Sequence, residues 1–370
     1  MGLQSETVNQ VALATSVEAS NRLVDDVGSS KQEQNLDALL GEAESAIDRF
    51  SYEEAAQKLK DVLNIDSNNL KALEMLAGIY LDEPNWDEAA NLFKQCISIS
   101  PDIGYSKYFS MGQLTSGEES LTYYQKGIEI LQKELENCEN IKPSEEEDRK
   151  ILSKNLSDAY CSVAEIFMTD CCDAENAEPQ CLSAIENAIQ SNTSNPEAYQ
   201  CLANFYIVKE QFKEAKEAIE KSLAFWLPHH EALRDADAET AFNFEALIPS
   251  YDSRIQTSKL LIELEMFEQA TNILDGLVDE DDEVPEVWYI LGWMNYMQSD
   301  EYKLNAHYYL KKATMVSAKL GMDDLDCISH ARELLKELEE KFPSLKEEVY
   351  EEDKEWSDVP SDSEDSEMET

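Results

Sequence analysis

An amphipathic segment of this chain recurs at an interval of 34 residues, and that interval restricts the fold more than any other feature of the sequence. The stretch YEEAAQKLKDVLNIDSN spans residues 52–68, and WDEAANLFKQCISISPD spans residues 86–102. In this register Tyr52 aligns with Trp86, and apolar residues follow at the three- and four-residue spacings of one helical face. A fixed period of this length indicates repeated helical hairpins.

A further helix precedes the later segment. It contains ALEMLAGIYLDE, and Pro84 and Asn85 follow it at a turn. Pro101 then marks the end of the hairpin, because proline cannot continue a helix. The hairpin resembles the tetratricopeptide repeat, whose first helix carries the pattern W-x-x-L-G. Residues 287–297, VWYILGWMNYM, contain that pattern intact.

Further copies extend the array along the chain. A lone hairpin cannot bury its apolar stripe, so similar hairpins stack on one another. The copy at residues 105–135 is about one helical turn short in its first helix. Small residues in the second helices mark close contacts with neighbouring helices: Ala55, Ala89, Ala215 and Ala270. The other copies lie at residues 158–191, 197–228, 254–278 and from 287 onward.

The pattern predicts an all-α fold, a tetratricopeptide-repeat superhelical solenoid with a disordered acidic C-terminal tail. We expect residues 36–342 to form about seven helical hairpins plus a capping helix, with an insertion near residues 228–250. Residues 323–342 supply the capping helix. Residues 1–35 and the strongly acidic residues 343–370 are expected to be disordered.

Acidic side chains dominate the charge. The chain has 78 Asp and Glu against 30 Lys and Arg, a net charge of −48, and the acidic tail accounts for only about −10 of it. A field of this sign repels phosphate backbones and anionic membranes and attracts cationic partners. No apolar run approaches the roughly 20 residues of a membrane span. We therefore expect no direct binding to nucleic acid or membrane, and a basic protein or peptide as the partner.

Residues typical of catalysis or metal binding form no recognisable set. The four histidines lie at positions 229, 230, 307 and 330 without a metal-binding frame, and the sequence has no phosphate-binding glycine loop or nucleophile motif. The eight cysteines include no pairs at zinc spacing and, without a secretory signal, indicate a reducing compartment. We expect a non-enzymatic protein with no catalytic residues, no metal and no cofactor.

In a tetratricopeptide array the first helices line the concave side, where peptides bind. Several converging carboxylates beside aromatic rings could hold a Lys- and Arg-rich segment through their summed field and cation–π contacts. For any single residue, a solvated helix face is the more frequent explanation. Projecting the arrangement onto this chain predicts eight partner-binding candidates: Glu74, Asp82, Asn204, Asp252, Glu263, Glu286, Tyr289 and Trp293.

Three longer stretches carry a more specific resemblance. They are GYSKYFSMGQLTSGEESLTYYQKGIEIL (104–131), residues 251–293 with the junction EDDEVPEVWYILGW, and the tail EDKEWSDVPSDSEDSEMET. With them, most of residues 36–370 resembles the fungal assembly chaperones dedicated to large-subunit ribosomal protein four. The resemblance implies a soluble escort that captures the basic, extended internal loop of the newly made ribosomal protein. It implies passage from the cytoplasm into the nucleus and assembly of the client into the pre-60S particle. We expect a monomer apart from the client.

Other interpretations remain open. A general tetratricopeptide interaction scaffold, or a histone-type escort for another basic client, would carry the same repeats and the same charge. Phosphorylation of Ser361, Ser363 and Ser366 in the acidic tail is compatible with each of these functions. A pull-down distinguishes them, because one dominant ribosomal client favours the dedicated chaperone and many acidic-to-neutral partners favour the scaffold.

Overall fold

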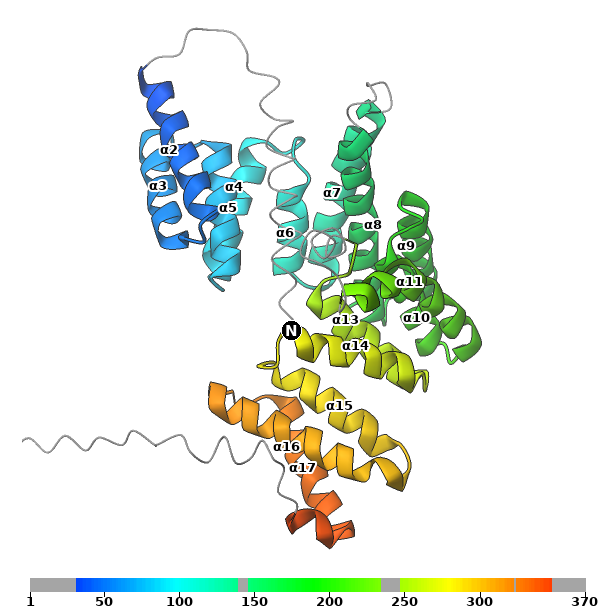
Figure 1. Ribbon diagram of the computed structural model, residues 1–370. Coiled ribbons are helices and arrows are strands. Elements are labelled where there is room, and N and C mark those ends of the chain that lie inside the picture. The colour runs from blue at the N-terminus through cyan, green and yellow to red at the C-terminus, as the bar shows by residue number, and fades with distance from the viewer. Residues whose placement is uncertain (1–30, 139–145, 234–246, 323, 348–370) are drawn as a thin grey trace, which may run out of the picture. The chain divides into compact units, whose positions relative to one another are not determined.

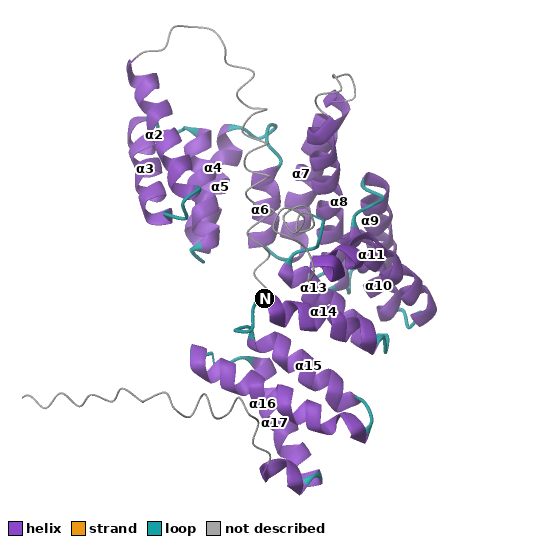
Figure 2. Cartoon of the chain, in the orientation of Figure 1, coloured by secondary structure: helices purple, strands orange, loops and turns teal. Residues whose placement is uncertain are grey.

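The computed structural model describes residues 31–138, 146–233, 247–322 and 324–347, and all regular structure within these ranges is helical (Figure 1; Figure 2). Its α-helices are α2 (Lys31–Ile47), α3 (Tyr52–Ile65), α4 (Leu70–Asp82), α5 (Trp86–Ile99), α6 (Ser106–Leu114), α7 (Gly117–Cys138), α8 (Glu146–Met168), α9 (Ala177–Ser191), α10 (Pro196–Val208), α11 (Phe212–Leu233), α13 (Tyr251–Glu263), α14 (Phe267–Glu280), α15 (Pro285–Met297), α16 (Lys303–Leu320) and α17 (Asp326–Lys341). Two short 3-10 helices are η2 (Asp300–Tyr302) and η3 (Pro343–Glu347). The predicted all-α class is confirmed.

The helices divide into two compact units, one ending at Ser253 and the other beginning at Arg254. Helices α2 to α11 belong to the first unit and α14 to α17 to the second, while α13 begins at the end of the first. Consecutive helices are paired, with short turns between partners such as α4 and α5 (Figure 1).

The apolar core of the first unit passes from one hairpin to the next. One cluster joins α2, α3 and α4 through Leu40, Leu59 and Leu76. The next cluster joins α4, α5 and α6 and includes Ala77 and Met111. A larger cluster joins α6 through α10. The core is therefore shared between hairpins, as stacking requires.

Small residues allow these helices to approach closely. Gly292 of the W-x-x-L-G pattern lies in α15, where an added Cβ would be 2.6 Å from Leu310 Cγ and 2.9 Å from the Leu310 backbone nitrogen of α16. The contact of α15 with α16 thus requires a glycine at this position. Each of the four predicted alanines is 0% exposed, which confirms their buried positions: Ala55, Ala89, Ala215 and Ala270.

The ends of the array differ from the prediction. Helix α2 begins at Lys31, not at residue 36, because the polar residues at its start are good helix formers that extend it. At the other end, η3 continues the regular structure beyond the predicted capping helix, because Leu345 is buried with the apolar residues of α17. Residues 1–30 and 348–370, for which disorder is predicted, lie outside the described residues.

Two interior helices depart from the usual length. Helix α6 has 9 residues where α4 has 13, which confirms the missing turn. Helix α11 has 22 residues and continues through Pro228 to Leu233. The insertion predicted near residues 228–250 therefore starts as an extension of α11, and residues 234–246 lie outside the described part of the chain.

Gly292→Ala should destabilise the protein by about 1–3 kcal/mol, because the new methyl group would overlap Leu310. Gly41→Ala is a matched control, since Gly41 also lies inside a helix but an added Cβ there would meet nothing within 4 Å. That substitution should instead stabilise by about 0.5–1 kcal/mol through helix propensity. Urea unfolding followed by circular dichroism measures both changes. Equal effects of the two substitutions would contradict a close α15–α16 contact.

Candidate functional site

The eight predicted partner-binding residues are distributed over the two units. Asp82 and Glu263 are exposed, Glu74 is buried, and the other five are partly buried. The first unit contains Glu74, Asp82, Asn204 and Asp252. The second unit contains Glu263, Glu286, Tyr289 and Trp293.

Glu74 belongs to a buried polar centre between α4 and α6. It is 8% exposed, and its neighbour Lys107 is 1% exposed. Burial raises the pKa of Glu74, and the charge of Lys107 opposes this shift. A Cβ added to Gly104 would lie 3.8 Å from Lys107 Nζ and 3.9 Å from Glu74 Oε1, so both charged groups lie beneath this loop. In this position the Glu74 carboxylate offers little surface to a partner.

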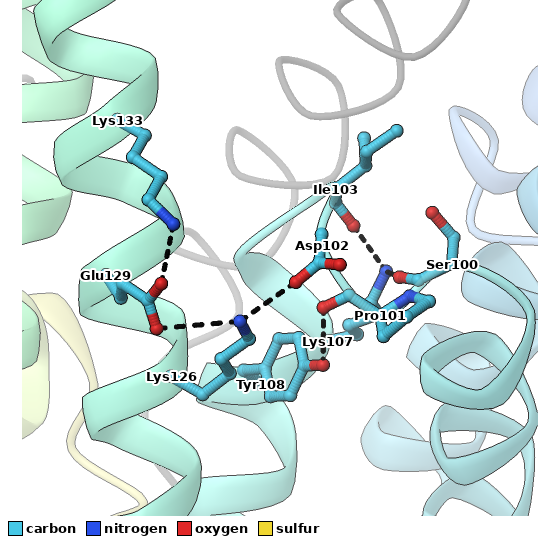
Figure 3. A network of polar contacts seen from close by, with 9 residues as sticks. All are labelled: Ser100, Pro101, Asp102, Ile103, Lys107, Tyr108, Lys126, Glu129 and Lys133. Carbon is cyan, nitrogen blue, oxygen red and sulfur yellow. Dashed lines mark hydrogen bonds and ion pairs between the residues drawn. The ribbon is translucent and has the colours of Figure 1, made fainter.

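Lys107 also fixes the connection between α5 and α6. Its ammonium donates hydrogen bonds to the carbonyl oxygens of Ser100, at 2.6 Å, and of Ile103 (Figure 3). The hydroxyl of Tyr108 donates to the carbonyl oxygen of Pro101 at 2.7 Å. These carbonyls lie at or just beyond the end of α5, where a helix leaves its last carbonyls without intrahelical partners. Lys107 therefore caps the end of α5, and the Glu74–Lys107 centre serves the fold.

A different group of carboxylates lies on α8 and α10. Asp158 and Glu165 belong to α8, and Glu197 belongs to α10. Asp158 Oδ1 accepts a hydrogen bond from Asn195 Nδ2 at 2.8 Å, and its Oδ2 lies 2.8 Å from Lys154 Nζ. We refer to Asp158, Glu165 and Glu197 as the α8–α10 carboxylates.

Asp158 and Glu197 are partly buried, whereas Glu165 is exposed. Burial and the charge of Asp158 raise the pKa of Glu197 to about 7, against the opposing effects of Lys154 and of a hydrogen bond with Ser253. Burial also raises the pKa of Glu165, although its side chain is exposed. Asp158 and Glu197 are therefore partly withdrawn from water. Charges in such a place attract a cation more strongly than charges on an open surface.

In the second unit, three predicted residues contact neighbouring helices. The Tyr289 hydroxyl lies 2.8 Å from His330 Nδ1 of α17. Trp293 packs against the apolar cluster that joins α16 and α17. Glu286 of α15 forms an ion pair with Lys259 of α13, with 2.8 Å between Oε1 and Nζ. Part of each side chain therefore contributes to packing, and the rest remains accessible.

The repeat contained a signal for two of the carboxylates that the prediction omits. Glu197 is the second residue of α10, as Asp252 is of α13 and Glu286 is of α15. The prediction includes the latter two and omits Glu197. Asp158 begins the predicted copy at residues 158–191, as Glu197 begins the copy at residues 197–228, whereas Glu165 lies inside its copy and has no such signal.

The α8–α10 carboxylates are chemically suited to binding a positively charged group. Within the described ranges, no three His, Cys, Asp or Glu side chains are placed to hold a metal ion. None of the helices in those ranges combines the length and the apolar character that crossing a bilayer requires.

Comparison with known proteins gives three informative similarities, while no protein-family model matches the chain. A Schizosaccharomyces pombe protein described as a probable assembly chaperone of rpl4 is 34% identical over 284 residues, which cover 72% of this chain and 79% of the relative. An Emericella nidulans protein with the same description is 26% identical over 280 residues, covering 71% and 66%. A solved structure described as the assembly chaperone of RpL4 (Acl4) is 25% identical, with a TM-score of 0.62, and the match covers 71% of this chain and 96% of that one. Together with the paired helices, these similarities identify a tetratricopeptide-like solenoid.

Lys107→Met should destabilise the first unit by about 1–3 kcal/mol, because the carbonyl oxygens of Ser100 and Ile103 would lose a buried donor. Lys126→Met is the matched control (Figure 3), since Lys126 pairs with Asp102 at 3.0 Å on the surface and exposed ion pairs contribute little. Thermal unfolding monitored by circular dichroism compares the two variants. If they were equally stable, the α5–α6 connection would not depend on the buried ammonium.

Proposed function

Because this chain belongs to the family of probable assembly chaperones of Rpl4, we propose that it binds newly made Rpl4 through carboxylates on its first helices. The family is non-enzymatic, so the protein acts by holding its client. In this proposal the bound segment is the basic, extended internal loop of Rpl4. The chaperone keeps Rpl4 soluble, accompanies it from the cytoplasm to the nucleus and delivers it to the pre-60S particle.

The observation that carries this proposal is the partial burial of Asp158 and Glu197, two of the α8–α10 carboxylates. A Lys or Arg side chain that enters this place meets Asp158 and Glu197 where water screens the charges less than on an open surface. The net charge of −48 adds a long-range attraction for a cationic client, which salt weakens.

Predicted residues near these carboxylates extend the proposed contact. Asn204 lies seven residues after Glu197 on α10 and therefore on the same helical face. Asp252 precedes Ser253, which forms a hydrogen bond with Glu197. We propose that Asn204 and Asp252 border the bound segment. Further proposed contacts are Asp82 in the first unit and Glu263, Glu286, Tyr289 and Trp293 in the second.

Asp158→Asn combined with Glu197→Gln should weaken Rpl4 binding about tenfold, because two attractive charges are lost with little change in shape. Isothermal titration calorimetry with purified Rpl4 at low and high salt measures this loss. The affinity of the double variant should also depend less steeply on salt. Glu214→Gln combined with Glu220→Gln is the control, since it removes the same charge from exposed positions of α11 and should leave binding close to wild type.

Two results would contradict the proposal. If the α11 control weakened binding as much as the double variant, net charge alone would account for the affinity. If the wild-type protein bound core histones as tightly as Rpl4, a general escort for basic proteins would explain the surface better than a dedicated one.

Affinity for Rpl4 should rise from about pH 6 to about pH 8 and then level off. The Glu197 carboxyl, with a pKa of about 7, is mostly protonated at the lower pH, and a bound cation favours its charged form. Binding at low pH must therefore release a proton, which costs affinity that is recovered as the pH rises. Calorimetry across this range should show the slope in the wild-type protein and a flatter profile for Glu197→Gln. A slope that persists in Glu197→Gln would have to come from another group.

A further inference from the structure

Lys154 already forms an ion pair with Asp158, one of the α8–α10 carboxylates. Its Nζ lies 2.8 Å from Asp158 Oδ2, one turn further along α8. The Lys154 side chain is 50% exposed, whereas that of Asp158 is 18% exposed. The ammonium therefore reaches from solvent onto a carboxylate whose other oxygen is held by Asn195.

Two carboxylates on different helices act on this ammonium. Partial burial favours the neutral amine, but the charges of Asp158 and Glu197 outweigh it and raise the pKa of Lys154. The influence is mutual, because Lys154 lowers the pKa of Glu197 against burial and the charge of Asp158. The empty protein thus has a lysine ammonium on Asp158, which is the kind of contact that a basic client would make.

We propose that Lys154 is an intramolecular substitute for a client cation, which pairs with Asp158 in the empty protein and is displaced by an arriving Lys or Arg side chain. This inference rests on the proposed function of the α8–α10 carboxylates. The Lys154 side chain is half-exposed, and its ion-pair partner lies on the same helix. The side chain can therefore move into solvent while α8 stays folded.

Such a substitute selects for segments with several positive charges. An isolated cation that displaces Lys154 replaces one ion pair with another and gains little. A segment with linked cations displaces Lys154 once and gains at every further carboxylate, because the later contacts are intramolecular. An arginine has an added advantage, since its planar guanidinium can contact carboxylates on both helices where an ammonium acts as a point charge.

Lys154→Met tests the proposal, because methionine keeps the length and helix propensity of lysine without its charge. With fluorescein-labelled decalysine as the probe, we expect about fivefold tighter binding to Lys154→Met than to the wild-type protein, measured by fluorescence anisotropy. Lys154→Arg keeps the charge and should bind the probe no more tightly than the wild-type protein. Lys150→Met is the matched control on α8, where Lys150 pairs with Glu147 at 3.2 Å, and should leave binding unchanged.

Unchanged or weaker decalysine binding by a folded Lys154→Met variant would overturn the proposal. It would also be overturned if Lys150→Met gained as much affinity, or if decalysine bound to none of the proteins. Rpl4 binding measured in parallel decides the proposed function separately. If the wild-type protein failed to bind Rpl4 while Lys154→Met still gained affinity for decalysine, the proposed client would be wrong and the role of Lys154 would stand.

Discussion

Each helical hairpin of this chain has apolar surface that only the next hairpin covers. The rest of the structure depends on this contact between successive hairpins. Helix α4 shows this directly, because Leu76 belongs to the cluster with α2 and α3 while the adjacent Ala77 belongs to the cluster with α5 and α6. A first helix with apolar neighbours on two sides has only a narrow face left for polar residues. Repetition of the hairpin gives each first helix a similar polar face, and the proposed function depends on which charges lie on these faces.

The interval of 34 residues was sufficient to predict the helical hairpins. The apolar residues that recur at this interval are the ones that form the stabilising contact between hairpins. It located the buried alanines and the missing turn of α6, which are consequences of spacing alone. It was less informative about α11, which continues through Pro228 although proline disrupts a helix interior. Trp226 and His230 on either side of that proline are both buried. Their rings also contact each other across the proline, with 5.7 Å between centroids, and the 34-residue interval does not predict this contact.

The candidate site was harder to predict than the fold, since a helical projection treats each helix separately. Glu74 has the expected position on α4 but is covered in the structure, because Lys107 from the next hairpin lies beside it. Tyr289 and Trp293 are partly covered by later helices in the same way. Glu197 is the opposite case. Its position in the repeat was visible in the sequence, but only the burial of its carboxyl group distinguishes it from the other acidic residues. Sequence position thus predicts the face of a helix, and tertiary packing decides which groups on that face remain available.

Acidic residues outnumber basic ones by 78 to 30, and a few of the cations are in addition committed to the fold. Lys107 and Lys303 are 1% and 8% exposed, and both donate to backbone carbonyls at the ends of helices. Arg254 forms an ion pair with Glu280 at 2.7 Å. Lys107 and Lys303, which bind backbone carbonyls, neutralise little of the outer surface, and repulsion among the many carboxylates opposes the compact state. A bound polycation relieves that repulsion, so client binding and folding stability are linked. Within that linkage, the proposed role of Lys154 has a physical reason, because carboxylates arranged to attract a cationic client repel one another in its absence and a nearby ammonium relieves that repulsion.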